Sequence, residues 1–194
     1  MDTKRLQAQY VRLLYSGNTA VLDASEEANY LLAHLDHARL EVEYKARIRN
    51  LRTTLHADMK FLNRFIDKVS LLEAVESYCG SDDFWKHQGR TLLEDFCLFY
   101  CNNHSHEPRL RMLAEIEGTV SGMSIGNVTT SPWVGHQQKM QNTVEVLAAH
   151  YIKNIKQLQT ATSIDDFSPT PDGGFFELTK DANSIRIKMM GGLK

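Results

Sequence analysis

The feature that most limits the fold of this chain is a long segment, residues 18–79, that contains neither glycine nor proline. No part of it alternates between apolar and polar residues as a half-exposed β-strand does. Its apolar residues recur instead at steps of three and four, the spacing that places side chains on one side of an α-helix. The segment therefore predicts a mostly α protein, and we expect a helical bundle.

Composition agrees with a compact globular chain. The 194 residues are 42% apolar and 24% charged, which fits one domain of ordinary size. Three cysteines, an odd number, do not indicate a disulfide framework. The longest wholly apolar run, Phe96 to Cys101, is far shorter than the roughly 20 residues that span a bilayer. We therefore expect a cytoplasmic protein without a membrane partner.

Helix signals place the first elements. A helix over about residues 2–16 should end at a Gly-Asn pair, and the next should begin after Ser25, which two glutamates follow. From there to Tyr78 the pattern fits one long helix or two, and we favour a break near Asn50 or Asp58.

The second half of the chain predicts shorter helices. We expect one over about 82–102, another from Pro108 to about Glu117, and a loop from Gly118 to Gly126. A long helix should then start at Ser131-Pro132. Its expected apolar stripe comprises Met140, Val144, Leu147, Tyr151, Ile155 and Leu158.

The C-terminal segment differs in character. Residues 168–174 are rich in turn formers, and apolar residues alternate on both sides of 181–184, which predicts a short β-hairpin. An isolated hairpin is marginally stable in water. We therefore divide the chain into a helical domain, 1–162, and a linker with hairpin, 163–194, that packs on the helices or on a partner.

Positive charge is concentrated in one amphipathic segment. Residues 45–68 hold seven Lys and Arg against two Asp, a local charge of +5 in a chain of net charge −2. We expect this long basic helix to bind an anionic partner, since segregated charge of this kind favours one. The predicted binding residues are Lys45, Arg49, Arg52, Lys60, Arg64 and Lys68.

These patterns favour a non-enzymatic accessory subunit of a multi-protein complex. The basic helix would bind an acidic surface of another protein subunit or a nucleic-acid backbone, because nothing in it specifies base readout. No sequence motif indicates a cofactor.

One alternative is enzymatic. Arg49 and Asn50, followed by His56, resemble the short signature of HEPN ribonucleases: an arginine, a polar residue and a histidine some positions later. The aromatic residue that often follows that histidine is absent here. The resemblance implies an all-helical protein that cuts RNA without metal, with Arg49 and His56 acting on the phosphate and the 2′-hydroxyl.

Two groups of residues have the chemistry of metal ligands. His34, His37 and Glu41 recur at steps of three and four, so a metal-binding helical bundle is a further alternative. Cys97 and Cys101 lie one helical turn apart in an apolar run, with His104 and His106 after them. For the cysteines we favour core packing, because a buried free cysteine behaves as a small hydrophobic residue.

Overall fold

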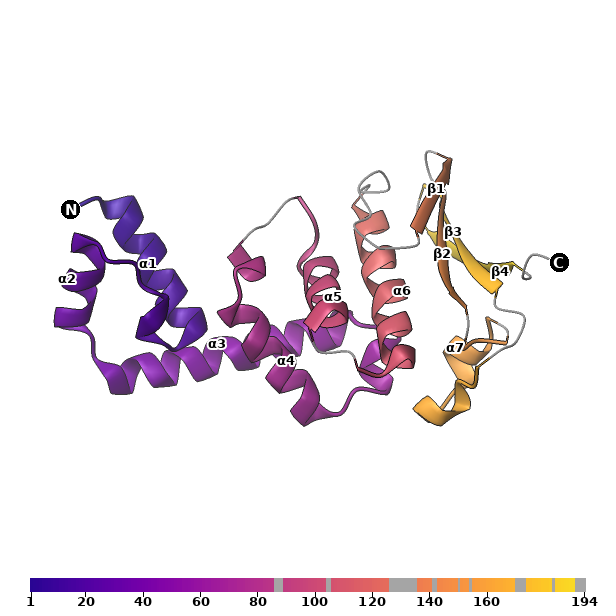
Figure 1. Ribbon diagram of the computed structural model, residues 1–194, viewed down its shortest axis with the longest axis horizontal. Helices are drawn as coiled ribbons and strands as arrows, with labels where there is room; N and C mark the ends of the chain where they lie inside the picture. Colours follow the sequence, from indigo (N-terminus) through magenta and orange to yellow (C-terminus); the bar gives the residue numbers. More distant parts are fainter. Residues whose placement is uncertain are drawn as a thin grey trace. The chain divides into compact units, whose positions relative to one another are not determined.

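The fold is described from a computed structural model (Figure 1). The structure describes residues 1–85, 89–103, 106–125, 136–140, 143–149, 151–153, 155–169, 174–182 and 184–190. The protein is mostly helical and ends in an antiparallel β-hairpin, as predicted. Its contacts group the chain into two compact units, residues 1–56 with 68–85, and residues 57–67 with 86–194.

The first unit is built from helices. Its elements are α1 (Thr3–Ser16), a 3-10 turn η1 (Thr19–Val21), α2 (Glu26–His34), α3 (His37–Asp58), α4 (Lys68–Gly80) and a 3-10 turn η3 (Asp83–Trp85). The last two residues of α3 are grouped with the second unit. The predicted start of α2 is confirmed, since the Ser25 side chain accepts a hydrogen bond from the Ala28 N–H. Leu13, Leu14 and Leu40 form one buried cluster of this unit.

The predicted end of the first helix is also confirmed. Gly17 follows α1 with a φ of +62°, and its N–H donates to the Leu13 carbonyl. A Cβ at Gly17 would lie 2.9 Å from the ring of Tyr44 on α3. Both the left-handed backbone and this close approach require glycine.

The segment from Ser25 to Tyr78 forms three helices. The predicted break near Asp58 is confirmed, and a second break lies at Leu35-Asp36. The long amphipathic basic helix is α3, which buries Ile48 and Leu55. The prediction of one basic helix over 45–68 was wrong, because α3 ends at Asp58. Lys60 follows it outside any helix, Arg64 lies on η2 (Leu62–Arg64) and Lys68 begins α4.

The second unit combines helices with a sheet. Its elements are a 3-10 turn η2 (Leu62–Arg64), α5 (Leu92–Asn103), α6 (Pro108–Ser124), β1 (His136–Met140), β2 (Thr143–Ala149), α7 (Gln157–Thr160), a 3-10 turn η4 (Ile164–Asp166), β3 (Gly174–Lys180) and β4 (Ile185–Met190). The strands form an antiparallel sheet in the order β1-β2-β3-β4. Helix α6 lies between α5 and this sheet (Figure 1).

The predicted C-terminal hairpin is confirmed, and its sheet comes from the same chain. Strand β3 pairs with β4 on one side and with β2 on the other. Leu178 lies opposite Ile187 in the register, and Phe176 and Leu178 are fully buried. Because α6 contacts β2, β3 and β4, the alternating apolar residues of the hairpin belong to the core of this unit.

Three sequence predictions were wrong in the second unit. The long helix from Ser131-Pro132 is replaced by β1 and β2, with residues 131–135 outside the described residues. The loop from Gly118 to Gly126 is wrong as well, because α6 continues to Ser124. The helix expected to start at 82 begins at Leu92, where the Thr91 hydroxyl accepts a hydrogen bond from the Glu94 N–H.

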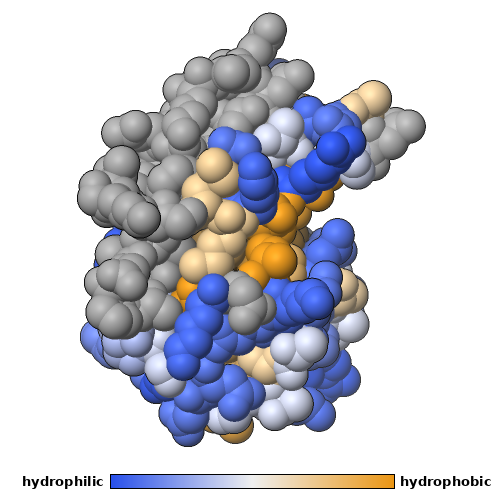
Figure 2. Space-filling model, turned by 90° about the vertical axis from the view of Figure 1, so that its right-hand side faces the viewer, coloured by the Kyte–Doolittle hydropathy of each residue, from blue (hydrophilic) through white to orange (hydrophobic). Residues whose placement is uncertain are grey.

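Apolar residues at the surface are unevenly distributed. Figure 2 shows a small group of them, with hydrophilic residues above, below and to the right, on the face turned toward the viewer. In the part of the chain that the structure describes, no helix combines the length and the apolar character needed to cross a membrane.

Candidate functional site

The basic side of α3 is the first candidate site. Lys45, Arg49 and Arg52 recur at steps of four and three, so their side chains follow one side of the helix. Lys45 and Arg49 are exposed, and Arg52 is half-buried. All three belong to the first unit, as does Lys68 at the start of α4. We call Lys45, Arg49 and Arg52 the α3 stripe.

Carboxylates accompany only the first turns of the stripe. The Lys45 ammonium lies 2.5 Å from the Glu41 carboxylate, and Arg47 lies 3.9 Å from Glu43. Exposed helix pairs of this kind contribute only about 0.3–0.5 kcal/mol each. Between residues 44 and 57 the helix carries no Asp or Glu, and among the described residues neither Arg49 nor Arg52 forms an ion pair.

Arg64, which the sequence placed among the binding residues, contacts its own chain. Its guanidinium donates hydrogen bonds to the carbonyl oxygens of Leu158 and Ala161 and lies over the Phe65 ring, 5.2 Å from the centroid. Through these hydrogen bonds the Arg64 side chain links η2 to the α7 segment within the second unit. Lys60 belongs to that unit too and is exposed.

The three residues of the ribonuclease-like signature share one helix. Arg49, Asn50 and His56 are all exposed on α3. Arg49 and His56 lie seven residues apart, which is about 10 Å along the axis and nearly the same side of the helix. The placement on one side therefore matches what the sequence spacing predicted.

The predicted metal ligands do not share one side of a helix. His34 ends α2 and His37 begins α3, so the break at Leu35-Asp36 separates them. The His34 Nδ1 lies 2.8 Å from the Tyr30 carbonyl oxygen, and its ring stacks on Tyr30. Glu41 pairs with Lys45. No group of three His, Cys, Asp or Glu side chains that could hold a metal ion occurs within the described residues.

Cys97 and Cys101 are buried on α5 as free thiols. Burial raises the pKa of both thiols, so they stay protonated and pack as apolar groups. His106 is exposed, and His104 lies outside the described residues.

The sequence analysis missed the role of Glu117 on α6. This residue is 2% exposed, and its carboxylate accepts hydrogen bonds from the N–H groups of Lys60, Phe61 and Leu62 at 2.8, 2.6 and 3.2 Å. Burial raises the pKa of Glu117, and these three donors oppose the shift. A signal was present, since Glu117 follows the apolar Leu113 by four residues on the side of α6 that faces the core.

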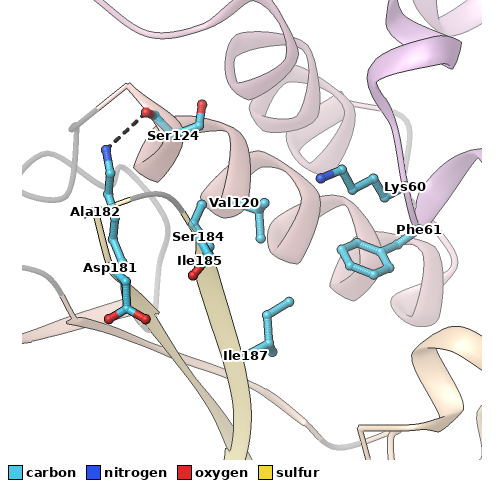
Figure 3. Close-up of a pocket in the computed structure, with 10 residues that line it drawn as sticks. Lys60, Phe61, Val120, Ser124, Asp181, Ala182, Ser184, Ile185 and Ile187 are labelled. Carbon is cyan, nitrogen blue, oxygen red and sulfur yellow. Dashed lines mark hydrogen bonds between the residues drawn. The ribbon is translucent and has the colours of Figure 1, made fainter.

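A cavity of about 560 Å³ was also missed, because residues far apart in sequence form it. Lys60 and Phe61 lie on one side and hairpin residues such as Ile185 and Ile187 on the other, with Val120 of α6 between them (Figure 3). No sequence spacing brings these segments together.

Comparison with known proteins gives no assignment of this site. We found no family model, curated protein or solved structure that matches the chain.

Proposed function

We propose that this chain is a non-enzymatic accessory subunit that binds an anionic partner through the α3 stripe. The partner is an acidic surface of another protein or a nucleic-acid backbone. The observation that supports this most is the pair Arg49 and Arg52, which lie on one helix side with no carboxylate between residues 44 and 57. A surface helix stabilised by its own pairs would interleave glutamates with these cations.

Local charge supports the same proposal. Residues 45–58 of α3 hold four Lys and Arg against one Asp. Neither Arg49 nor Arg52 has to give up an ion pair within its own helix in order to bind an anion. Cations that neutralise phosphates or carboxylates release counterions, so the resulting affinity falls as salt is added. Arg64 is left out of the proposed interface, because its donors already bind carbonyl groups of its own chain.

The test compares two double variants of equal charge change. Arg49→Glu with Arg52→Glu should weaken binding of a single-stranded 20-nucleotide RNA or of poly-glutamate by about tenfold or more at low salt. Lys4→Glu with Arg39→Glu, at exposed positions of the same unit, should leave it nearly unchanged. Fluorescence anisotropy gives both dissociation constants. Equal losses in the two variants, or no binding of either polyanion by the unchanged protein, would contradict the proposal.

A second candidate is metal-independent RNA cleavage, favoured by the placement of Arg49 and His56 on one side of α3. It predicts RNA cleavage in EDTA that is lost in both Arg49→Ala and His56→Ala and kept in Arg39→Ala. Intact RNA after incubation with the unchanged protein would exclude it.

A further inference from the structure

The cavity of the second unit has the size and walls of a small-molecule site. Its volume of about 560 Å³ falls within the range of roughly 300–1,000 Å³ that ligand sites occupy. Three elements enclose it: the Lys60-Phe61 segment, the C-terminal half of α6, and the β3–β4 hairpin.

One part of the wall is apolar and incompletely covered by protein, and the rest is polar. Phe61, Val120, Ile185 and Ile187 all line the cavity, and all four are only half-buried. On the neighbouring strand β3, Leu178 is fully buried. The apolar face of the sheet is therefore covered by protein at β3, whereas at β4 its isoleucines are partly exposed to the cavity.

The polar groups at the cavity favour a negative ligand. Lys60 and Lys180 both line it, and the Lys180 ammonium is positioned by a 3.0 Å hydrogen bond to the Ser124 carbonyl. Asp181, the carboxylate among the lining residues, forms a 2.7 Å ion pair with Arg186, which offsets part of its negative charge. Glu117, near Lys60, already accepts three backbone hydrogen bonds.

We propose that this cavity binds a carboxylic acid with an aliphatic tail, of the medium-chain fatty acid class. The tail lies against Phe61, Val120 and the two isoleucines of β4. The carboxylate lies between Lys60 on one side of the cavity and Lys180 on the hairpin side, and both lysines supply positive charge. This site is independent of the α3 stripe, so either can fail without the other.

The binding test uses decanoate, octanoate and decanol with the full chain, by isothermal titration calorimetry below the concentrations at which these compounds aggregate. Decanoate should bind at one site. Octanoate, shorter by two methylenes, should bind about fifteenfold more weakly, because each methylene changes affinity about fourfold. Decanol should also bind about tenfold more weakly than decanoate, because it lacks the charge. Equal binding of decanol and decanoate, or no saturable binding of decanoate, would overturn the proposal.

Variants locate the two ends of the ligand. Lys60→Met and Lys180→Met keep side-chain length and remove charge, so each should weaken decanoate about fivefold to tenfold and leave decanol unchanged. Lys188→Met, at an exposed position of β4, is the matched control and should change neither. Decanoate should also shift the methyl resonances of Ile185 and Ile187 in NMR spectra. Unchanged affinity in both lysine variants, or shifts confined to other methyl groups, would overturn the assignment.

Discussion

At the scale of single residues, two buried carboxylates on neighbouring helices differ in whether hydrogen-bond donors compensate for their loss of contact with water. Glu117 on α6 has three backbone donors. Glu94 on α5 is 2% exposed, and its Oε2 has no hydrogen-bond partner among the described residues. A buried carboxylate with donors favours its charged form, whereas one without them favours the protonated form.

Replacement of Glu117 should loosen the segment that follows α3. Glu117→Gln keeps one carbonyl oxygen for three N–H donors and turns an amide donor toward them, so we expect a loss of about 2–3 kcal/mol in the free energy of unfolding. Urea denaturation followed by circular dichroism measures it. Glu115→Gln on the same helix weakens a single half-buried ion pair with Arg111 and leaves no backbone donor unpaired, so it should cost only about 1 kcal/mol. Similar losses in the two variants would show that the three hydrogen bonds contribute little.

Glu94 should make stability depend on pH. Burial, with a smaller effect of Asp95, raises the pKa of Glu94 from 4.5 to about 7, although Arg90 opposes the shift. Between these values the folded protein keeps a proton that the unfolded chain has released. The free energy of unfolding should therefore fall as pH rises through this window.

The variant Glu94→Gln removes this titration. It should be more stable than the unchanged protein at pH 8, by about 2 kcal/mol, and lose that advantage near pH 4.5. Thermal denaturation across this pH range tests it. Glu73→Gln, at an exposed position of α4, should keep the original profile. A profile of Glu94→Gln parallel to that of the unchanged protein would assign the pH dependence to other groups.

At the scale of elements, helical spacing and capping residues predicted most of the helices, but long-range contacts decided the exceptions. Residues 143–146 carry Val144 and Val146 about Glu145, an alternation that competes with the helical stripe. Pairing of β2 with both β1 and β3 selects the strand. The glycines of α6 were interpreted as a loop, although Gly122 serves close packing between two helices. Sequence alone does not distinguish these uses of glycine.

Gly122 gives a test of that packing. A Cβ at this position would lie 2.6 Å from Glu94 Oε1, so Gly122→Ala should destabilise the fold by about 1–3 kcal/mol despite alanine's higher helix propensity. In a Glu94→Ala background the same change should be neutral or stabilising, by up to about 1 kcal/mol. A double-mutant cycle from urea denaturation measures the difference.

The matched control for this cycle is Gly80→Ala at the end of α4, where an added Cβ meets no atom within 4 Å. It should be neutral or slightly stabilising in both backgrounds. Additive effects of Gly122→Ala and Glu94→Ala would show that the two side chains do not compete for space.

At the scale of the whole molecule, the two units interleave along the chain. Residues 57–67 belong to the second unit and lie between two segments of the first. The predicted boundary at 162/163 follows composition, and it stays a prediction. Composition and periodicity report local structure, so they do not show which unit a short segment such as 57–67 belongs to. Its contact with the second unit depends on hydrogen bonds from its backbone N–H groups to the Glu117 carboxylate. The cavity and the contact of Arg64 with α7 escaped the sequence for the same reason.

The two units should open separately in hydrogen exchange. Leu71→Ala, in the first unit, and Leu178→Ala, in the second, each remove a side chain no more than 2% exposed, a change that costs about 2–5 kcal/mol. Amides of the unit that carries the change should exchange about 100-fold faster, because local opening free energy follows local packing. Amides of the other unit should change little. Mass spectrometry of peptides from α1 and β4 separates these outcomes. Equal acceleration in both peptides by either variant would mean that the chain opens as one cooperative unit.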